Sequence, residues 1–271
     1  MGYQIDGVAI ITGAGSGIGK ACALAYAAEG ARGLVVADLD YNSAVETTRE
    51  CDSQATNPTY RSLAVAVDVT DMDSVTKMVQ QAVETFGRID YSVNSAGIGV
   101  KQHRAVDEVS VDEMNRFWQV NVLGTFNCVQ AVTTVMKGQS IASTTVGGRE
   151  RSLGRGVILN VASCNSYMAV PGILPYTTAK HGTLGLTRNA ALDCAPYEIR
   201  VNAICPGWVD TPMLSAVGGL PASTLNNIPM RRVAQAEEVA DVVLFMTSPG
   251  ASYVTGVGWI VDGGTTLQLQ T

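Results

Sequence analysis

Four glycines close to the start of the chain constrain its fold more than any other feature. They lie in Val8-Ala-Ile-Ile-Thr-Gly-Ala-Gly-Ser-Gly-Ile-Gly19, where an apolar run precedes the glycines. The apolar run is typical of a short buried strand, and residues 20–29 hold strong helix formers without proline. A strand, a glycine turn and a helix in this order let backbone N–H groups approach a phosphate at the positive end of the helix dipole. The alternative is an ordinary glycine-rich turn between a strand and a helix.

Further apolar runs with strand character follow and alternate with helical stretches. The runs lie at 34–37, 62–67, 89–93, 156–161, 199–204 and 258–261. The helical stretches lie at 20–29, 43–51, 71–86, 111–136, 176–194 and 236–247, and Asn121 and Gly124 interrupt the fourth. This alternation predicts one α/β domain over residues 1–271, with a Rossmann-like, doubly wound parallel sheet of about seven strands and helices on both faces. Ligands of such sheets bind outside the carboxyl ends of the strands, where the polar and glycine-rich segments of this chain gather.

Two stretches interrupt the alternation. Residues 137–156 are rich in Gly, Ser, Thr and Arg and lie between a helix and a strand, so we expect a long loop that forms a surface excursion. Residues 211–233 have weak periodicity and follow the end of a strand, so we expect a lid that folds over a bound ligand. For both stretches the alternative is a surface loop without a role in binding.

Composition and charge narrow the classes of function. The chain is 46% hydrophobic and 15% charged, which suits a folded protein with a large core. Its net charge of −6 argues against a nucleic-acid partner, because phosphate backbones bind basic patches. No apolar run approaches the ~20 residues that a membrane span needs. The N-terminus lacks a signal-peptide pattern, so we expect a cytoplasmic protein without membrane association.

The cysteines point to neither a metal site nor a disulfide framework. Six of them are scattered along the chain, without a C-x-x-C pair and with only two histidines. Metal ligands need a closer spacing, and a chain of this length does not depend on disulfides. We therefore expect no bound metal.

Tyr176 and Lys180 form a candidate acid/base pair. They are four residues apart at the start of a helical stretch, so they share one face. A tyrosine phenol has a pKa of ~10, and a neighbouring ammonium group favours the phenolate and lowers that pKa. Ser163 follows the fifth apolar run and offers a hydroxyl to a substrate oxygen. Taken alone, a Tyr/Lys pair at this spacing is more often a surface pair.

These motifs in sequence order resemble the short-chain dehydrogenase/reductase family. The matching residues are Thr12-Gly-x-x-x-Gly-Ile-Gly19, Asp68, Asn94-Ser-Ala-Gly97, Asn121, Ser163, Tyr176-x-x-x-Lys180 and Pro206-Gly207. The resemblance runs from about residue 7 to residue 264. This chain departs from the family at Ser95, where the family often has Asn, and in 137–156, where the family usually has a short turn.

The resemblance implies a catalytic role for each of four residues. Tyr176 would be the acid/base at the carbonyl or alcohol oxygen, and Lys180 would lower its pKa and bind the nicotinamide ribose. Ser163 would polarise and orient the carbonyl. Asn121 would hold a water that links Lys180 to solvent. The structural alternatives are that Asn121 caps a kink and that Ser163 is a turn residue.

The resemblance also implies a nicotinamide cofactor and the residues that hold it. They are Gly13, Ser16, Gly17, Ile18, Gly19, Asp38, Leu39, Asp68, Val69, Asn94, Ala96, Gly97, Tyr176, Lys180, Pro206, Gly207, Val209 and Thr211. A carboxylate at Asp38, which ends the second apolar run, would accept hydrogen bonds from the adenosine ribose hydroxyls and repel a 2′-phosphate. Ser16 and Leu39 stand where family members that use NADP often carry a basic residue. We therefore predict NAD rather than NADP.

The substrate is less constrained than the cofactor. Its candidate contacts are Ser163, Asn165, Tyr176, Trp208 and Met213. Most of the surrounding segments are apolar, which suggests an uncharged, fairly hydrophobic secondary alcohol or ketone, such as a cyclic, terpenoid or polyketide compound. The general character resembles fungal members of secondary metabolism. The alternatives are a redox-neutral epimerase, dehydratase or cyclase, and a catalytically silent nucleotide-binding protein.

The resemblance further implies a homotetramer or homodimer. Family members commonly associate through the two long helical stretches, 111–136 and 176–194, and through the C-terminal strand. The small residues Ala179, Gly182 and Gly185 would allow a close approach of helices from two subunits.

Overall fold

A parallel β-sheet forms the centre of the computed structural model, which describes residues 3, 5–216, 218–220 and 222–267. The strands of this sheet are β1 (Val8–Thr12), β2 (Gly33–Asp38), β3 (Arg61–Ala66), β4 (Tyr91–Asn94), β7 (Gly156–Val161), β8 (Ile199–Pro206) and β9 (Gly258–Val261). Their order is β3-β2-β1-β4-β7-β8-β9, and every pairing is parallel. The direction of winding reverses between β1 and β4, which confirms the predicted doubly wound fold.

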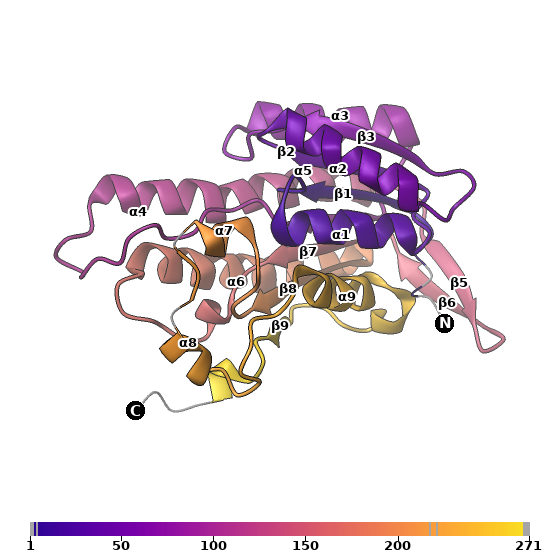
Figure 1. The fold of residues 1–271 in the computed structure, drawn as a ribbon. Coiled ribbons are helices and arrows are strands. Elements are labelled where there is room, and N and C mark those ends of the chain that lie inside the picture. Colours follow the sequence, from indigo (N-terminus) through magenta and orange to yellow (C-terminus); the bar gives the residue numbers. More distant parts are fainter. Residues whose placement is uncertain (1–2, 4, 217, 221, 268–271) are drawn as a thin grey trace.

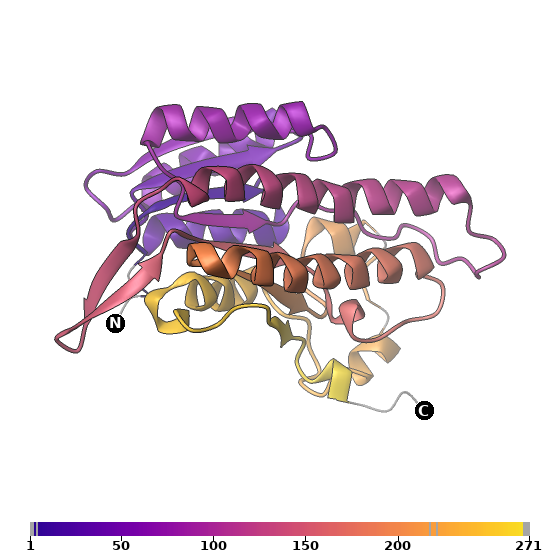
Figure 2. The same cartoon turned by 180° about the vertical axis from the view of Figure 1, so that it is seen from behind.

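Helices cover both faces of the sheet (Figures 1 and 2). One layer holds α1 (Gly17–Ala28), α2 (Tyr41–Gln54) and α9 (Ala236–Thr247), and the other holds α3 (Met72–Phe86), α5 (Gly124–Lys137) and α6 (Leu174–Cys194). Side chains alternate along a strand, so Ile11 of β1 packs into the first layer and Ile10 into the second. Both faces of β1 are therefore buried, which explains its unbroken apolar sequence.

The long helical stretch is interrupted where the sequence predicted. The helix α4 (Val111–Trp118) continues into a π-helical turn, Gln119–Leu123, before α5 begins. The backbone carbonyl of Asn121 accepts hydrogen bonds from the hydroxyls of Thr125 and Thr183, at 2.9 and 3.0 Å. A π turn is frequently found at functional sites.

The surface excursion at 137–156 is a hairpin rather than the loop that we expected. The strands β5 (Ala142–Val146) and β6 (Arg149–Gly154) pair antiparallel and project from the body of the molecule (Figures 1 and 2). Gly147 and Gly148 join them with φ angles of +58° and +75°, as a tight hairpin turn requires. The Gly-Gly dipeptide was the sequence signal for this turn. The hairpin precedes the start of β7, so it lies at the end of the sheet opposite the carboxyl edge.

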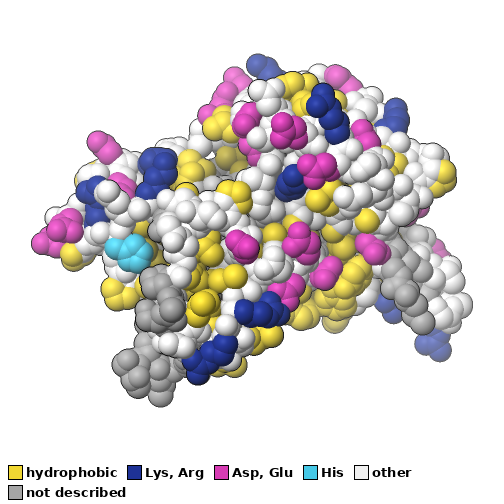
Figure 3. Space-filling model, viewed as in Figure 1, with side chains coloured by type: hydrophobic (Ala, Val, Ile, Leu, Met, Phe, Trp, Pro, Cys, Tyr) yellow, Lys and Arg dark blue, Asp and Glu magenta, His cyan; other side chains and the backbone are white. Residues whose placement is uncertain are grey.

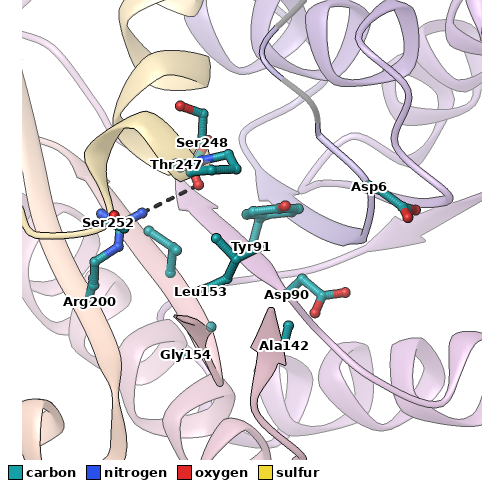
Figure 4. A pocket seen from close by; sticks show the side chains of 13 residues that line it. Asp6, Asp90, Tyr91, Ala142, Leu153, Gly154, Arg200, Thr247, Ser248 and Ser252 are labelled. Carbon is teal, nitrogen blue, oxygen red and sulfur yellow. Dashed lines mark hydrogen bonds between the residues drawn. The ribbon is translucent and has the colours of Figure 1, made fainter. Parts of the chain in front are cut away.

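A small cavity of about 30 Å³ lies beside the base of this hairpin (Figure 4). The buried Arg200 borders the cavity and donates hydrogen bonds to the carbonyl oxygens of Met246 and Thr247, at 3.0 and 3.4 Å. These carbonyls end α9, where the helix dipole favours a cation. Burial lowers the pKa of Arg200 to about 10. Arg200 therefore caps the C-terminal end of α9.

Among the helices that the structure describes, none is long and apolar enough to cross a bilayer. All six cysteines are buried free thiols.

Candidate active site

The glycine turn packs tightly against the neighbouring strand ends. Gly13 has a φ of +67°, and a Cβ there would lie 2.7 Å from the N and Cα atoms of Ala96. Ser95 donates its N–H to the carbonyl of Thr12 at 3.2 Å, which joins the turn to the segment after β4. The first N–H groups of α1, at Gly17 and the following residues, have no intrahelical acceptor. The turn therefore offers close backbone access and free donors, as a pyrophosphate group requires.

Asp38 lies beside this turn at the end of β2. Its carboxylate accepts hydrogen bonds from the N–H of Gly15 at 2.8 Å and from the N–H of Asp40 at 3.0 Å. These bonds orient the side chain, and each oxygen keeps a lone pair for a further donor. Leu39 is largely exposed, and the ammonium group of Lys20 is paired with Glu50 at 2.8 Å.

The predicted adenine and ribose residues divide into those with an exposed side chain and those with a buried one. Asp68 is exposed at the carboxyl edge, whereas the side chain of Val69 is buried against Gly124. The side-chain amide of Asn94 donates to Asn160 at 2.8 Å within the core. The side chains of Val69 and Asn94 are therefore structural, and the predicted contacts of both residues with a cofactor stay predictions.

Asn121 uses its side chain to hold the segment after β4. Its Oδ1 atom accepts the N–H of Ile98 at 2.9 Å, and its Nδ2 atom donates to the carbonyl of Ile98 at 3.1 Å. A Cβ at Gly97 would lie 2.8 Å from that Oδ1 atom, so only glycine allows this approach. Asn121 is thus a positioning residue for 97–98, and its predicted water-holding role stays a prediction.

Ser163 and Tyr176 meet at the carboxyl end of β7. Ser163 ends the extended segment and caps a short 3₁₀ turn, Cys164–Ser166, by accepting the N–H of Asn165 at 3.2 Å. Tyr176 lies in the first turn of α6, and the ring of Phe117 packs edge-on against it with centroids 6.4 Å apart. Burial raises the pKa of Tyr176 to about 12, although the nearby hydroxyl of Ser163 lowers the pKa in part.

Lys180 is buried below Tyr176. Its ammonium group donates to the carbonyl of Val161 at 2.8 Å and lies 5.6 Å from the centroid of the Tyr176 ring. Burial lowers the pKa of Lys180 to about 8. In the free protein burial raises the pKa of the phenol, and the expected lowering of that pKa by Lys180 stays a prediction.

The segment after β8 crosses the carboxyl edge as two short helices, α7 (Pro212–Ser215) and α8 (Ala222–Asn226). The methyl group of Thr211 lies 3.2 Å from the position that a Cβ on Gly17 would take. The sulfur of Met213 lies 2.7 Å from the corresponding position on Gly99. The start of the predicted lid thus contacts both the glycine turn and the segment after β4. Residues 217 and 221 of the predicted lid lie outside the described residues.

The other predicted residues of this segment lie at the base of the lid. Gly207 continues the pairing with β9 by donating its N–H to Val261 at 2.9 Å, directly after Pro206. The side chain of Val209 is buried in the layer of α1 and α9. Trp208 borders a hollow of about 90 Å³ whose described lining residues do not include Ser163, Tyr176 or Lys180. The contact of Trp208 with substrate stays a prediction.

A buried chain of polar side chains below the site was missed by the sequence analysis. Asn94 donates to Asn160, which donates to Thr187 at 2.9 Å, and Thr187 donates to the carbonyl of Thr183 at 2.8 Å. The hydroxyl of Thr183 reaches the carbonyl of Asn121. This chain ties β4, β7, α6 and the π turn together. The available signal was Asn160, a polar residue inside an apolar strand.

Known proteins match the chain over nearly its full length. The model of a family described as enoyl-(acyl carrier protein) reductase matches residues 13–266. Short-chain dehydrogenase anuF of Penicillium roqueforti is 66% identical over 275 residues, which cover 100% of both chains. Short-chain dehydrogenase fogB of Aspergillus ruber is 48% identical over 97% of this chain and 98% of its own.

Solved structures agree with this similarity. The crystal structure of 3-ketoacyl-(acyl-carrier-protein) reductase from Brucella melitensis, complexed with NADH, superimposes with a TM-score of 0.81. The two chains are 32% identical, and the match covers 96% of this chain and 98% of that chain.

Proposed function

The chain belongs to the short-chain dehydrogenase/reductase family, and on this premise we propose that it is an NAD-dependent oxidoreductase that interconverts a secondary alcohol and a ketone. The observation that carries the proposal is the meeting of Ser163, Tyr176 and Lys180 at the carboxyl edge of the sheet. The glycine turn lies at this same edge, at the point where the sheet reverses its winding.

Each residue of this group has one task in the proposed mechanism. The bound nicotinamide supplies or accepts the hydride at the carbonyl carbon. Ser163 donates a hydrogen bond to the carbonyl oxygen and orients it. Tyr176 is neutral near pH 7 because burial raises its pKa, so it can give its proton to that oxygen during reduction. Lys180, held by Val161, stabilises the phenolate that remains.

The residues present fit NAD better than NADP. A Cβ at Gly13 would collide with the backbone of Ala96, and a Cβ at Gly19 would collide with the carbonyl of Gly13, so only glycine allows this turn, whose free N–H groups suit a pyrophosphate. The carboxylate of Asp38 is oriented beside it and would repel a 2′-phosphate. Lys20 is paired with Glu50 and does not offset that charge.

The substrate that we propose is an uncharged, fairly hydrophobic ketone or secondary alcohol. A small apolar cluster of Phe117, Val122 and Ala179 surrounds the base of Tyr176, with Ile98 and Val100 packed against it. Met213 adds an exposed apolar side chain from the lid. An apolar wall with a few convergent polar groups suits a substrate of this class.

We further propose that the protein forms a homotetramer or homodimer. Figure 2 shows α5 and α6 side by side on the outer surface, where Phe126 and Leu192 are exposed. Figure 3 shows apolar side chains over α9, beside which Trp259 of β9 is exposed. Of the small residues expected between subunits, Gly182 instead packs on Trp118 of the same chain, and only Gly185 faces open space.

Tyr176→Phe tests the assignment directly. The variant should lose NADH consumption with a panel of cyclic ketones by at least about 10³-fold, because no other placed group gives the proton. NADH binding, measured by fluorescence titration, should persist. Turnover that survives the change would contradict the mechanism. Product formed by the unchanged protein without net NADH consumption would favour a redox-neutral reaction instead.

A further inference from the structure

Thr183 joins the helix of the proposed catalytic residues to the π turn. It lies in α6, three residues after Lys180, and it is fully buried. Its hydroxyl lies 3.0 Å from the carbonyl oxygen of Asn121 and 3.1 Å from the carbonyl oxygen of Ala179 in its own helix. The single proton of this hydroxyl is therefore shared between α6 and the π turn.

The π turn extends this connection to the segment after β4. The side chain of Asn121 binds the N–H and the carbonyl of Ile98, at 2.9 and 3.1 Å. A Cβ on Gly97 would lie 2.8 Å from Oδ1 of Asn121 and 3.8 Å from Nζ of Lys180. Asn121 and Lys180 thus approach the same point of the backbone, and the hydroxyl of Thr183 connects the two elements that carry them.

The buried face of α6 offers few large apolar side chains to fix its position. Its buried residues are Pro175, Ala179, Lys180, Thr183, Leu184, Thr187, Ala191 and Cys194. Dispersion contacts of small side chains are weak and without direction, whereas a hydrogen bond fixes a distance and an angle. The hydroxyl of Thr187 binds Asn160 of β7 at 2.9 Å, and the hydroxyl of Thr183 binds the π turn. These two hydroxyls therefore tie α6 to both of its neighbours.

We infer that Thr183 is a positioning residue that fixes the register of α6 against the π turn, and with it the place of Tyr176 and Lys180. This inference rests on the proposed function and adds a residue to its machinery. Thr183 acts through the helix and not on the reacting atoms. A displacement of about 1 Å at reacting groups lowers a rate by roughly 10²-fold, so a register bond of this kind has a large effect on turnover.

Thr183→Val and Thr183→Ser separate the hydroxyl from the packing. Valine keeps the shape of threonine without the donor, and serine keeps the donor without the methyl group. With NADH and a cyclic ketone, Thr183→Val should lower kcat by about 10- to 100-fold. The KM for NADH should change by less than about threefold, because Asn121 still holds Ile98. Thr183→Ser should keep kcat within about threefold of the unchanged protein. A larger loss in the serine variant than in the valine variant would show a packing role and overturn the inference.

Thr125→Val is the matched control. The hydroxyl of Thr125 binds the same carbonyl of Asn121 at 2.9 Å, but Thr125 lies in α5, which continues directly from the π turn. Its removal therefore takes a donor from that carbonyl without taking a bond from α6. Thr125→Val should lower kcat by less than about threefold. Equal losses in Thr125→Val and Thr183→Val would show that Thr183 only satisfies the carbonyl, and would refute the inference.

Hydrogen exchange keeps the test independent of turnover. In the free protein, amide hydrogens of residues 176–190 should exchange at least about tenfold faster in Thr183→Val, and at nearly the unchanged rate in Thr183→Ser and Thr125→Val. If the unchanged protein reduces no ketone but exchange follows this pattern, the proposed reaction fails while the register role of Thr183 stands. If ketones are reduced but Thr183→Val matches Thr125→Val in kcat and in exchange, the inference fails while the proposed reaction stands.

Discussion

Lys180→Met should stabilise the free protein although it removes a residue of the proposed active site. Lys180 is 6% exposed, and burial lowers its pKa from 10.5 to about 8. At about 1.4 kcal/mol per pH unit, this difference corresponds to about 3 kcal/mol of destabilisation whenever the group is charged in the folded state. Losing the hydrogen bond to Val161 costs about 1 kcal/mol. The net gain near pH 7 is therefore about 2 kcal/mol.

The lowered pKa of Lys180 determines how the stability gain of Lys180→Met varies with pH. The folded pKa lies below the unfolded value, so the unfolded chain binds more protons between about pH 8 and 10.5. The stability of the unchanged protein therefore rises with pH in that interval. The advantage of Lys180→Met should be complete below about pH 8 and fade as the pH approaches 10.5.

The assay is thermal and urea unfolding of the cofactor-free protein from pH 6.5 to 9.5. For a chain of this size, about 2 kcal/mol corresponds to a rise in Tm of roughly 4–8 °C. Lys77→Met, at an exposed position on α3, is the matched control and should change Tm little. An unchanged or lower Tm for Lys180→Met at pH 7, or a gain that does not vary with pH, would refute the reasoning.

Three further predictions follow from the same geometry. Asp38→Ala should relax the preference for NADH, because removing the carboxylate ends its repulsion of the 2′-phosphate of NADPH. The ratio of kcat/KM for NADH to kcat/KM for NADPH should fall by at least about tenfold. An unchanged ratio would count against Asp38 as the residue that selects NADH. Gly13→Ala should cost at least about 2 kcal/mol in urea unfolding because of its positive φ and the nearby Ala96 backbone, whereas Gly185→Ala, with open space around its Cβ, should be neutral or stabilise by up to about 1 kcal/mol. Alcohol oxidation should accelerate from pH 7 to 10 because it needs the phenolate of Tyr176, whose pKa burial raises to about 12; a rate that falls over this range would contradict that assignment.

Much of the fold follows from local patterns in the sequence. The strands and helices are short segments whose apolar spacing predicts their type, and the glycine turn predicts where the first strand meets the first helix. The interruption near Asn121 was also visible, because a polar residue and a glycine break the helical stretch. The hairpin at 142–154 was missed because its strands carry few apolar residues, and the Gly147-Gly148 turn was the remaining sign.

The sequence by itself determined the order of the elements. It also determined that Ser163, Tyr176 and Lys180 lie at the ends of strands and helices, because propensity and periodicity act over neighbouring residues. What only the tertiary structure decided is the environment of those groups. Burial raises the pKa of Tyr176, and the amide oxygen of Asn165 lacks a partner within the described chain. Burial and hydrogen-bond pairing depend on contacts between segments far apart in the chain, so no local pattern could have revealed them.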